Sequence, residues 1–324
     1  MKAVMCKQLG PPETLTIEDV PSPRAGHGEI VVSIKAASVN FPDGLIVQGK
    51  HQTRAVPPFI PGYEMAGVIK AVGEGVKGLK PGDRGVAQLK WGGFAEEVAL
   101  SADRFWPIPD ELDYVRAAAF PLAYGTSYYA LKNRGLLKAG ETLVVLGAAG
   151  GVGIAGVQFG KIMGARVIAC ASSAEKLDIC RRHGADELIN YTTEDLREAL
   201  KRLTGGTGVD VVLDPVGGRY AEPVVRSMAW EGRYLIVGFT AGEIPKIPLN
   251  LALLKGSSLV GVLWDTYSHR NPEGGRQNIR EMAEMILAGK LDPLVSATYP
   301  LDRAVEAIQH VMDRKVLGKV VLVP

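Results

Sequence analysis

A glycine-rich segment, "LGAAGGVG" at residues 146–153, follows an apolar run and precedes a helix-like pattern. Aligned to the dinucleotide fingerprint G-x-G-x-x-G, it places Ala148 in the first glycine position, followed by Gly150 and Gly153. Where a strand turns into a helix, the first helical amides and the helix dipole point at a phosphate. The segment therefore predicts a pyrophosphate-binding loop, formed by Ala148, Ala149, Gly150, Gly151, Val152 and Gly153. A plain strand-to-helix turn is the alternative.

The segment "ACASSAEK" at residues 169–176 occupies the place, about 20 residues after the glycines, where an NAD site usually carries Asp or Glu. Here Ser172 and Ser173 can donate hydrogen bonds to a 2′-phosphate, and Lys176 can neutralise it. This favours NADPH over NADH. Tyr191, after the next predicted strand, is expected to flank the adenosine end. The alternative for Lys176 is an ordinary solvated surface charge.

These residues lie in a region where apolar strands alternate with amphipathic helices. We predict strands at 142–146, 166–169, 187–189, 210–213, 234–237 and 259–263, and helices within 125–135, 153–164, 173–184, 194–205 and 220–230. Such alternation indicates parallel βαβ units. Ligands bind beyond the carboxyl ends of such strands, so the predicted cofactor contacts include Gly238, Phe239, Thr240, Leu263 and Trp264. Trp264 either stacks over the cofactor ring or packs between domains.

The flanking regions differ from this pattern. Residues 1–120 consist of short apolar runs separated by Gly and Pro clusters, which indicates a β-rich module. The tail has helical patterns near residues 278–288 and 302–313 and a closing strand, "KVVLVP". It is too short to form its own domain, so we expect it to pack on the N-terminal module.

Composition narrows the class of protein. With 324 residues, 47% of them hydrophobic and 22% charged, the chain predicts two globular domains. A formal net charge of +2 without a basic run gives no reason to expect nucleic acid as a partner. The three cysteines form no CxxC pair, and no stretch has the composition of a signal peptide or a membrane span. We therefore expect a cytoplasmic protein.

Eight segments occur in order along the chain: "PGYEMAGVI", "KPGDRG", "GGFAE", "GTSYYAL", "LGAAGGVG", "GADELINY", "GVDVVLDPVGG" and "GKVVLV". Together they resemble the medium-chain dehydrogenase/reductase superfamily, in its zinc-free, zeta-crystallin-like quinone oxidoreductase branch. The resemblance implies an α/β fold with a GroES-like β-barrel catalytic domain (1–124 and 264–324) and a Rossmann doubly wound parallel-sheet domain (125–263). It also implies a cleft between the domains for the nicotinamide, and homodimers or homotetramers built through the cofactor domains.

The same resemblance also indicates whether a zinc ion should be expected. Zinc-dependent relatives supply Cys from a C-x-x-D segment and His from a G-H-E segment, where this chain has Asn40-x-x-Asp43 and Gly62-Tyr63-Glu64. An amide and a phenol replace the soft donors that zinc requires, the four-cysteine structural lobe is missing, and the five histidines lack ligand spacing. We expect no metal.

Asn40 is the leading candidate for polarising a substrate oxygen or holding the nicotinamide, and Asp43, Tyr63 and Thr126 are further catalytic candidates. Lys319, in "GKVVLV", is a further predicted cofactor contact. Similar quinone reductases have tyrosines just after the N-x-x-D segment, where this chain has Leu45 and His51, which suggests a different substrate pocket.

The expected reaction is NADPH-dependent, metal-independent reduction of quinones or other α,β-unsaturated carbonyls. Hydride adds to the β-carbon and the charge spreads over an enolate, which hydrogen-bond donors stabilise. Three alternatives remain: an enoyl-CoA reductase for substrates such as acryloyl-CoA or crotonyl-CoA, an NADPH-binding structural or RNA-associated protein with little turnover, and a zinc alcohol dehydrogenase.

Overall fold

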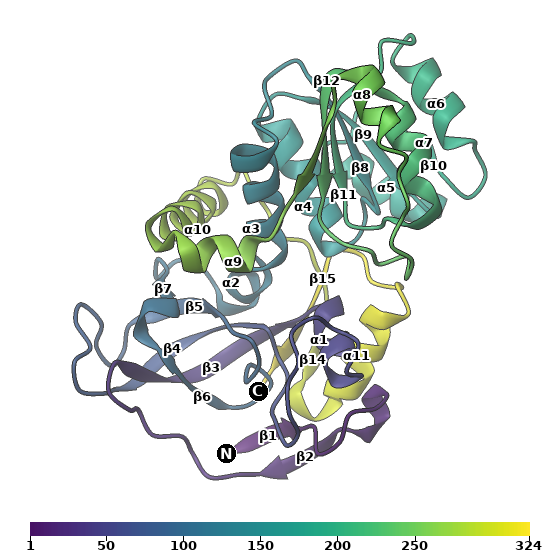
Figure 1. Ribbon diagram of the computed structural model, residues 1–324. Helices are drawn as coiled ribbons and strands as arrows, with labels where there is room; N and C mark the ends of the chain where they lie inside the picture. The colour runs from purple at the N-terminus through teal and green to yellow at the C-terminus, as the bar shows by residue number, and fades with distance from the viewer. The chain divides into compact units, whose positions relative to one another are not determined.

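The structure is a computed structural model that describes all residues 1–324. The chain forms two compact units (Figure 1): the first contains Met1–Leu122 and Ser268–Pro324, and the second contains Ala123–Tyr267. The predicted domain boundaries, after residues 124 and 263, lie two and four residues from these divisions. None of the helices combines the length and the apolar composition that a membrane span needs.

The first unit is built mainly of strands. They are β1 (Lys2–Met5), β2 (Thr16–Asp19), β3 (Glu29–Val39), β4 (Glu64–Val72), β5 (Arg84–Gln88), β6 (Glu97–Ser101), β7 (Phe105–Pro107), β14 (Val295–Pro300) and β15 (Lys319–Val323). The helices are α1 (Phe41–Val47), α2 (Tyr114–Ala119), α10 (Pro272–Leu287) and α11 (Ala304–Met312), and α9 (Trp264–Arg270) crosses the division. The main sheet has the order β14-β15-β3-β4-β5-β7, with β6 also paired to β3. Because β15 pairs with β3, the tail packs on the N-terminal module as expected.

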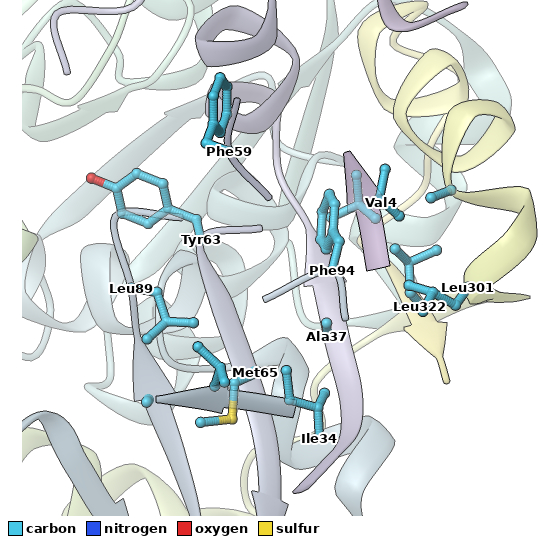
Figure 2. Packing of buried hydrophobic residues seen from close by; sticks show 14 of the residues in the cluster. Val4, Ile34, Ala37, Phe59, Tyr63, Met65, Leu89, Phe94, Leu301 and Leu322 are labelled. Atoms are coloured by element: carbon cyan, nitrogen blue, oxygen red, sulfur yellow. The ribbon is translucent and has the colours of Figure 1, made fainter. Parts of the chain in front are cut away.

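The core of the first unit lies between these strands. Figure 2 shows Val4 of β1, Ile34 and Ala37 of β3, Met65 of β4 and Leu322 of β15 within this core, and all five are buried. The strand register follows from this packing, because a slip by one residue would turn the apolar side chains outward. Ser38 lies opposite Glu64 in the β3–β4 pair.

The second unit is a parallel sheet with helices. Its strands are β8 (Thr142–Leu146), β9 (Arg166–Ala171), β10 (Glu187–Asn190), β11 (Val209–Asp214), β12 (Met228–Ile236) and β13 (Ser258–Gly261). Its helices are α3 (Ala123–Tyr128), α4 (Gly151–Ile162), α5 (Ala174–Arg182), α6 (Leu196–Leu203), α7 (Ala221–Arg226) and α8 (Asn250–Lys255). The strand order β10-β9-β8-β11-β12-β13 is that of the doubly wound dinucleotide fold. The six predicted strands and the predicted fold class are confirmed.

Three predicted helices differ from the structure. The helix predicted within 220–230 ends at Arg226, because Met228 already pairs with Val209 of β11 and starts β12. The helix predicted within 125–135 is α3 followed by a π-helical segment, Tyr129–Arg134. The tail helix begins at Pro272 rather than 278, where the Asn271 side chain accepts a hydrogen bond from the Gly274 amide.

Candidate functional site

The glycine-rich loop leaves β8 and enters α4 as predicted. Gly147 has a φ of +58°, a conformation that favours glycine, and turns the chain. The Gly150 amide donates to the Gly147 carbonyl at 3.0 Å, and the first helical hydrogen bond runs from Ile154 to the Gly150 carbonyl at 2.8 Å. The amides of the first three helical residues therefore have no acceptor within the helix, and the first turn carries no acidic residue. This end of α4 suits an anion.

Gly150 and Gly153 differ in the space around them. A Cβ atom at Gly150 would meet only the Gly147 carbonyl oxygen, at 3.5 Å, which is an ordinary contact. A Cβ atom at Gly153 would lie 2.2 Å from that oxygen and 2.6 Å from the Ala148 Cα atom. The fold itself therefore requires glycine at 153 but not at 150. Open space beside the Gly150 backbone is what close approach of a phosphate needs.

Two further glycines let α4 approach the sheet. A Cβ atom at Gly156 would lie 2.4 Å from the Leu213 side chain, and one at Gly160 would lie 2.7 Å from the Leu143 and Val167 side chains. This role of Gly156 and Gly160 was not predicted. The signal was present, because positions 153, 156 and 160 fall on one face of a helix.

The serines and the lysine after β9 come together, but they do different things. The Ser173 hydroxyl accepts a hydrogen bond from the Lys176 amide at 3.3 Å and so caps α5. The Lys176 ammonium donates to the Ser172 hydroxyl at 3.3 Å. The hydroxyl of Thr192, which follows β10, donates to the Asn190 side-chain oxygen at 2.6 Å and lies 3.3 Å from the Ser172 carbonyl. Ser172 and Lys176 thus form a hydroxyl–ammonium pair at the carboxyl ends of β9 and β10.

The loops after β11 and β12 are hydrogen-bonded to each other. Asp214, at the end of β11, is buried and accepts hydrogen bonds from the amides of Val216 at 2.7 Å and Gly217 at 2.8 Å. Its other carboxylate oxygen accepts from the Tyr234 hydroxyl. Burial raises the pKa of Asp214, and these donors oppose that rise. Asp214 and Tyr234 were not predicted, because nothing in the local pattern shows that they pair.

The predicted contacts in the loop after β12 are largely bonded to the loop after β11. The Gly238 amide donates to the Asp214 carbonyl at 3.3 Å, and the amide and hydroxyl of Thr240 donate to the Pro215 carbonyl at 3.1 and 3.0 Å. Phe239 is 39% exposed and Leu263 is 52% exposed. The exposed side chains, rather than Gly238 and Thr240, are the ones open to a ligand here.

Trp264 packs inside the second unit. It is 2% exposed, and its ring centroid lies 6.0 Å from those of Tyr129 and Tyr267. A Cβ atom at Gly125 would lie 2.5 Å from the indole nitrogen, so α3 lies closely against the ring. Trp264 was predicted either to stack over the cofactor ring or to pack between domains. Stacking would require the side chains that cover this buried ring to move away.

In the first unit, the predicted residue Asn40 belongs to a buried polar cluster with Glu64 and Lys319. Asn40 follows β3, Glu64 starts β4 and Lys319 starts β15, so the sheet brings them together. The Asn40 amide nitrogen donates to the Glu64 carboxylate at 2.9 Å and to the Ser38 carbonyl at 3.2 Å. The Lys319 ammonium donates to the Asn40 amide oxygen and, at 3.0 Å, to Glu64. Polarisation of a substrate oxygen by Asn40 would require one of its two donor bonds to break.

Asp43 lies beside this cluster in the first turn of α1. One carboxylate oxygen accepts from the Asn40 backbone amide at 2.8 Å, and the Tyr63 backbone amide also faces the carboxylate and opposes the effect of burial on its pKa. Burial raises the pKa of Asp43 to about 7, the Glu64 charge adds to the rise, and the Lys319 ammonium opposes it. Burial thus favours the protonated form of Asp43 more than in an exposed aspartate.

Tyr63 and Thr126 are the other predicted catalytic residues. Tyr63 is buried in the apolar core, and its ring meets that of His51 edge-on with centroids 6.5 Å apart. Thr126 is half-buried on α3 of the second unit.

The donor set does not fit zinc. No group of three or more His, Cys, Asp and Glu side chains is arranged to hold a metal ion. At the position of the zinc ligands in the resembling enzymes, the Asn40 oxygen and the Glu64 carboxylate already accept from the Lys319 ammonium. A fixed positive charge there repels a metal cation. The absence of a metal itself stays a prediction.

Comparison with known proteins agrees with this architecture. Residues 26–110 match the family described as "Alcohol dehydrogenase GroES-like domain", and residues 151–287 match "Zinc-binding dehydrogenase". The quinone oxidoreductase-like protein 2 homolog of Nematostella vectensis is 39% identical over 99% of this chain and 88% of its own length. The chain belongs to the medium-chain dehydrogenase/reductase superfamily, in its quinone oxidoreductase branch.

Solved structures of this branch and its relatives superpose on the whole chain. The Escherichia coli quinone oxidoreductase complexed with NADPH has a TM-score of 0.95 and 30% identity, covering 100% of both chains. An NAD-dependent alcohol dehydrogenase has a TM-score of 0.91 and 32% identity, again over 100% of both chains. The superfamily fold thus accompanies both coenzymes, and the chain is an oxidoreductase by family.

Proposed function

We propose that the protein is an NADPH-dependent, metal-independent reductase of quinones or other α,β-unsaturated carbonyls. The observation that carries the proposal is the site after β8 and β9. The backbone at Gly150 lies open, and the hydroxyl–ammonium pair of Ser172 and Lys176 stands where an NAD site usually has a carboxylate. The family supports the reaction class, and the E. coli relative was crystallised with NADPH.

Bound at this site, the coenzyme supplies the hydride, and the chain's own groups bind and orient it. The open amides at the start of α4 would receive the pyrophosphate, while Ser172 and Lys176 would receive the 2′-phosphate. A carboxylate at Ser172 would repel that phosphate. Because one related structure is an NAD-dependent enzyme, the fold alone does not fix the coenzyme, and we assign the choice to these residues.

The cluster in the first unit would supply a fixed positive charge. A lysine ammonium has three N–H groups, and Lys319 donates two of them to Asn40 and Glu64. We assign the third to the substrate. In this assignment Asn40 positions Lys319 rather than contacting the substrate, and a protonated Asp43 leaves the Lys319 and Glu64 charges balanced.

Binding of both coenzymes to a double variant tests the coenzyme assignment. Ser172→Asp combined with Lys176→Ala should weaken NADPH binding by more than about 100-fold, since a repulsion is added and an attraction removed, and should change NADH binding by less than about threefold. Isothermal titration calorimetry measures both. Equal losses for the two coenzymes would show that these residues do not recognise the phosphate.

A turnover screen tests the reaction. NADPH consumption with 1,4-benzoquinone, 9,10-phenanthrenequinone and simple enones is the expected result, and enoyl-CoA thioesters are included as competitors. Faster turnover of crotonyl-CoA than of any quinone would show that the substrates are enoyl-CoA thioesters instead of quinones. NADPH binding without turnover of any of these compounds would favour a protein that uses the coenzyme structurally.

We also propose that the protein is a homodimer or homotetramer formed through the second unit. Strand β13 pairs only with β12, which leaves one of its edges unpaired. Near it in the sequence, helix α8 exposes Leu253 (79%) and Leu254 (69%), and Trp230 of β12 is 70% exposed. Apolar groups exposed in this way favour association. Light scattering should show a dimer or tetramer, and Leu253→Glu should shift it toward the monomer.

A further inference from the structure

The segment after β11 places an arginine and an aromatic ring beside the predicted adenosine site. Arg219 and Tyr220 belong to a short 3-10 helix, Gly218–Tyr220, and neither was predicted to bind anything. The Tyr220 ring lies against the Tyr191 ring, with centroids 4.4 Å apart and planes tilted by 43°. The Arg219 guanidinium lies 5.1 Å from the Tyr220 centroid and donates to the Tyr220 hydroxyl at 3.1 Å. We call these three residues the Arg219 stack.

The strand order shows where the Arg219 stack lies. Tyr191 follows β10 and Tyr220 follows β11, and these strands are separated by β9 and β8. Three strand spacings amount to about 14 Å. Because the two rings nevertheless touch, the segments after β10 and β11 together span the carboxyl ends of β9 and β8. Those ends carry Ser172 and the glycine-rich loop.

A backbone hydrogen bond joins the stack to the segment of the hydroxyl–ammonium pair. The Tyr191 amide donates to the Ala171 carbonyl, next to Ser172, at 3.2 Å, and the neighbouring Thr192 hydroxyl lies 3.3 Å from the Ser172 carbonyl. The segment that carries the Tyr191 ring is thus fixed to the segment that carries Ser172.

The charge of Arg219 is not balanced by a carboxylate. Several arginines of the second unit form ion pairs, such as Arg166 with Glu187 at 2.9 Å and Arg226 with Glu222 at 2.6 Å. Arg219 is exposed and has no acidic partner, and its contact with Tyr220 uses one N–H group. A guanidinium has five N–H groups in a planar fork that matches phosphate oxygens. The aromatic contact restricts this fork while leaving most of its donors available.

We propose that Arg219 is a second cation for the 2′-phosphate of NADP(H), acting with Lys176, and that Tyr191 and Tyr220 form the aromatic wall beside the adenine. This inference rests on the proposed use of NADPH and adds a specificity-determining residue to it. Two cations on one phosphate would make the choice of coenzyme depend on the segment after β11 as well as on the segment after β9.

Two small ligands isolate the 2′-phosphate: 2′,5′-ADP carries it and 5′-AMP lacks it, while both contain the adenosine. Calorimetry on the full-length protein should show that Arg219→Ala weakens 2′,5′-ADP about tenfold, as loss of a charge-assisted hydrogen bond predicts, and 5′-AMP less than about twofold. Arg219→Lys should fall between. Arg197→Ala is the matched control, because Arg197 is an exposed arginine of α6 without an ion pair. It should change neither affinity by more than about twofold.

The outcomes separate this inference from the proposed function. If wild-type protein prefers 2′,5′-ADP and Arg219→Ala retains that preference, Arg219 does not bind the phosphate and the NADPH proposal stands. If Arg219→Ala weakens both ligands equally, Arg219 supports the adenosine and not the phosphate, and the inference is overturned. If wild-type protein shows no preference between the ligands, the NADPH proposal fails, and the inference fails with it.

Discussion

The polar cluster of the first unit and the phosphate-binding edge of the second unit use their charged groups in opposite ways. In the cluster, Asn40, Glu64 and Lys319 are buried and bonded mainly to one another. At the edge, the Gly150 backbone lies in open space and Arg219 has no counter-ion. Polar groups that are paired within the fold stabilise the contacts between strands, whereas polar groups without a partner remain available to bind a ligand. Substitutions should therefore cost stability in the first region and coenzyme affinity in the second.

The largest effect on stability is expected at Glu64. Glu64→Ala leaves the Lys319 ammonium buried without a counter-ion and removes the acceptor of the Leu122 amide, which lies 2.6 Å from Glu64. Breaking a buried pair in this way should lower the free energy of unfolding by about 3–5 kcal/mol, measured by urea denaturation. Glu64→Gln with Lys319→Met removes both charges and should recover most of the loss. A single variant as stable as wild type would contradict the assignment of these charges to the fold.

The second-largest effects are expected at two glycines, Gly150 and Gly153. Gly150→Val should weaken NADPH binding by roughly 100-fold, about 3 kcal/mol, because the side chain fills the space proposed for the phosphate. Its free energy of unfolding should change by less than about 1 kcal/mol, since the protein offers no clash at that position. Gly153→Val should instead destabilise the fold by at least about 1–3 kcal/mol through overpacking. Identical behaviour of the two variants in both assays would remove the distinction.

Asp43 gives a pH-dependent test of the cluster. Its folded-state pKa of about 7 lies above the ordinary value of 3.8, so the folded chain binds this proton more tightly than the unfolded chain. That stabilisation is complete below the unfolded pKa and is lost as the pH rises through about 7. Asp43→Asn cannot ionise, so it should gain stability relative to wild type between pH 5 and pH 8, by about 2 kcal/mol.

Urea denaturation of both proteins at several pH values measures this difference. Asp313→Asn is a suitable control, because Asp313 pairs with Lys315 at the exposed end of α11 and should show a change below about 0.5 kcal/mol. If the stability curves of wild type and Asp43→Asn remain parallel from pH 5 to pH 8, Asp43 does not carry the shifted proton.

The parallel sheet and its phosphate loop could be predicted because their signals are local. The strand at 142–146, the glycine-rich segment directly after it and the "SSAEK" segment about 20 residues further on are each readable from a few consecutive residues. The parallel pairing then follows from the alternation of strands with helices. Met228–Trp230 was assigned to a helix because its pairing partner, Val209, lies far outside the local window.

The polar cluster could not be predicted, because its members are distant in sequence. Lys319 and Glu64 are 255 positions apart and meet only through the order β15-β3-β4. The family resemblance placed Asn40 at the position of a metal ligand but did not indicate that an ammonium would bond to it. The same limit applies to Arg219, whose relation to the adenosine site depends on the contact between Tyr191 and Tyr220.

The smallest effects are expected at Ser172 and Ser173, two neighbouring serines for which the sequence pattern predicted the same role. Ser173 caps α5 through the Lys176 amide, so Ser173→Ala should cost about 1 kcal/mol of stability and change NADPH affinity little. The Ser172 hydroxyl accepts only from the Lys176 ammonium, so Ser172→Ala should leave stability within about 0.5 kcal/mol and weaken NADPH binding several-fold. Denaturation and calorimetry on both variants measure the four values. If Ser173→Ala weakens NADPH more than Ser172→Ala does, the capping hydroxyl also binds the phosphate, and the division between paired and open groups fails at this helix.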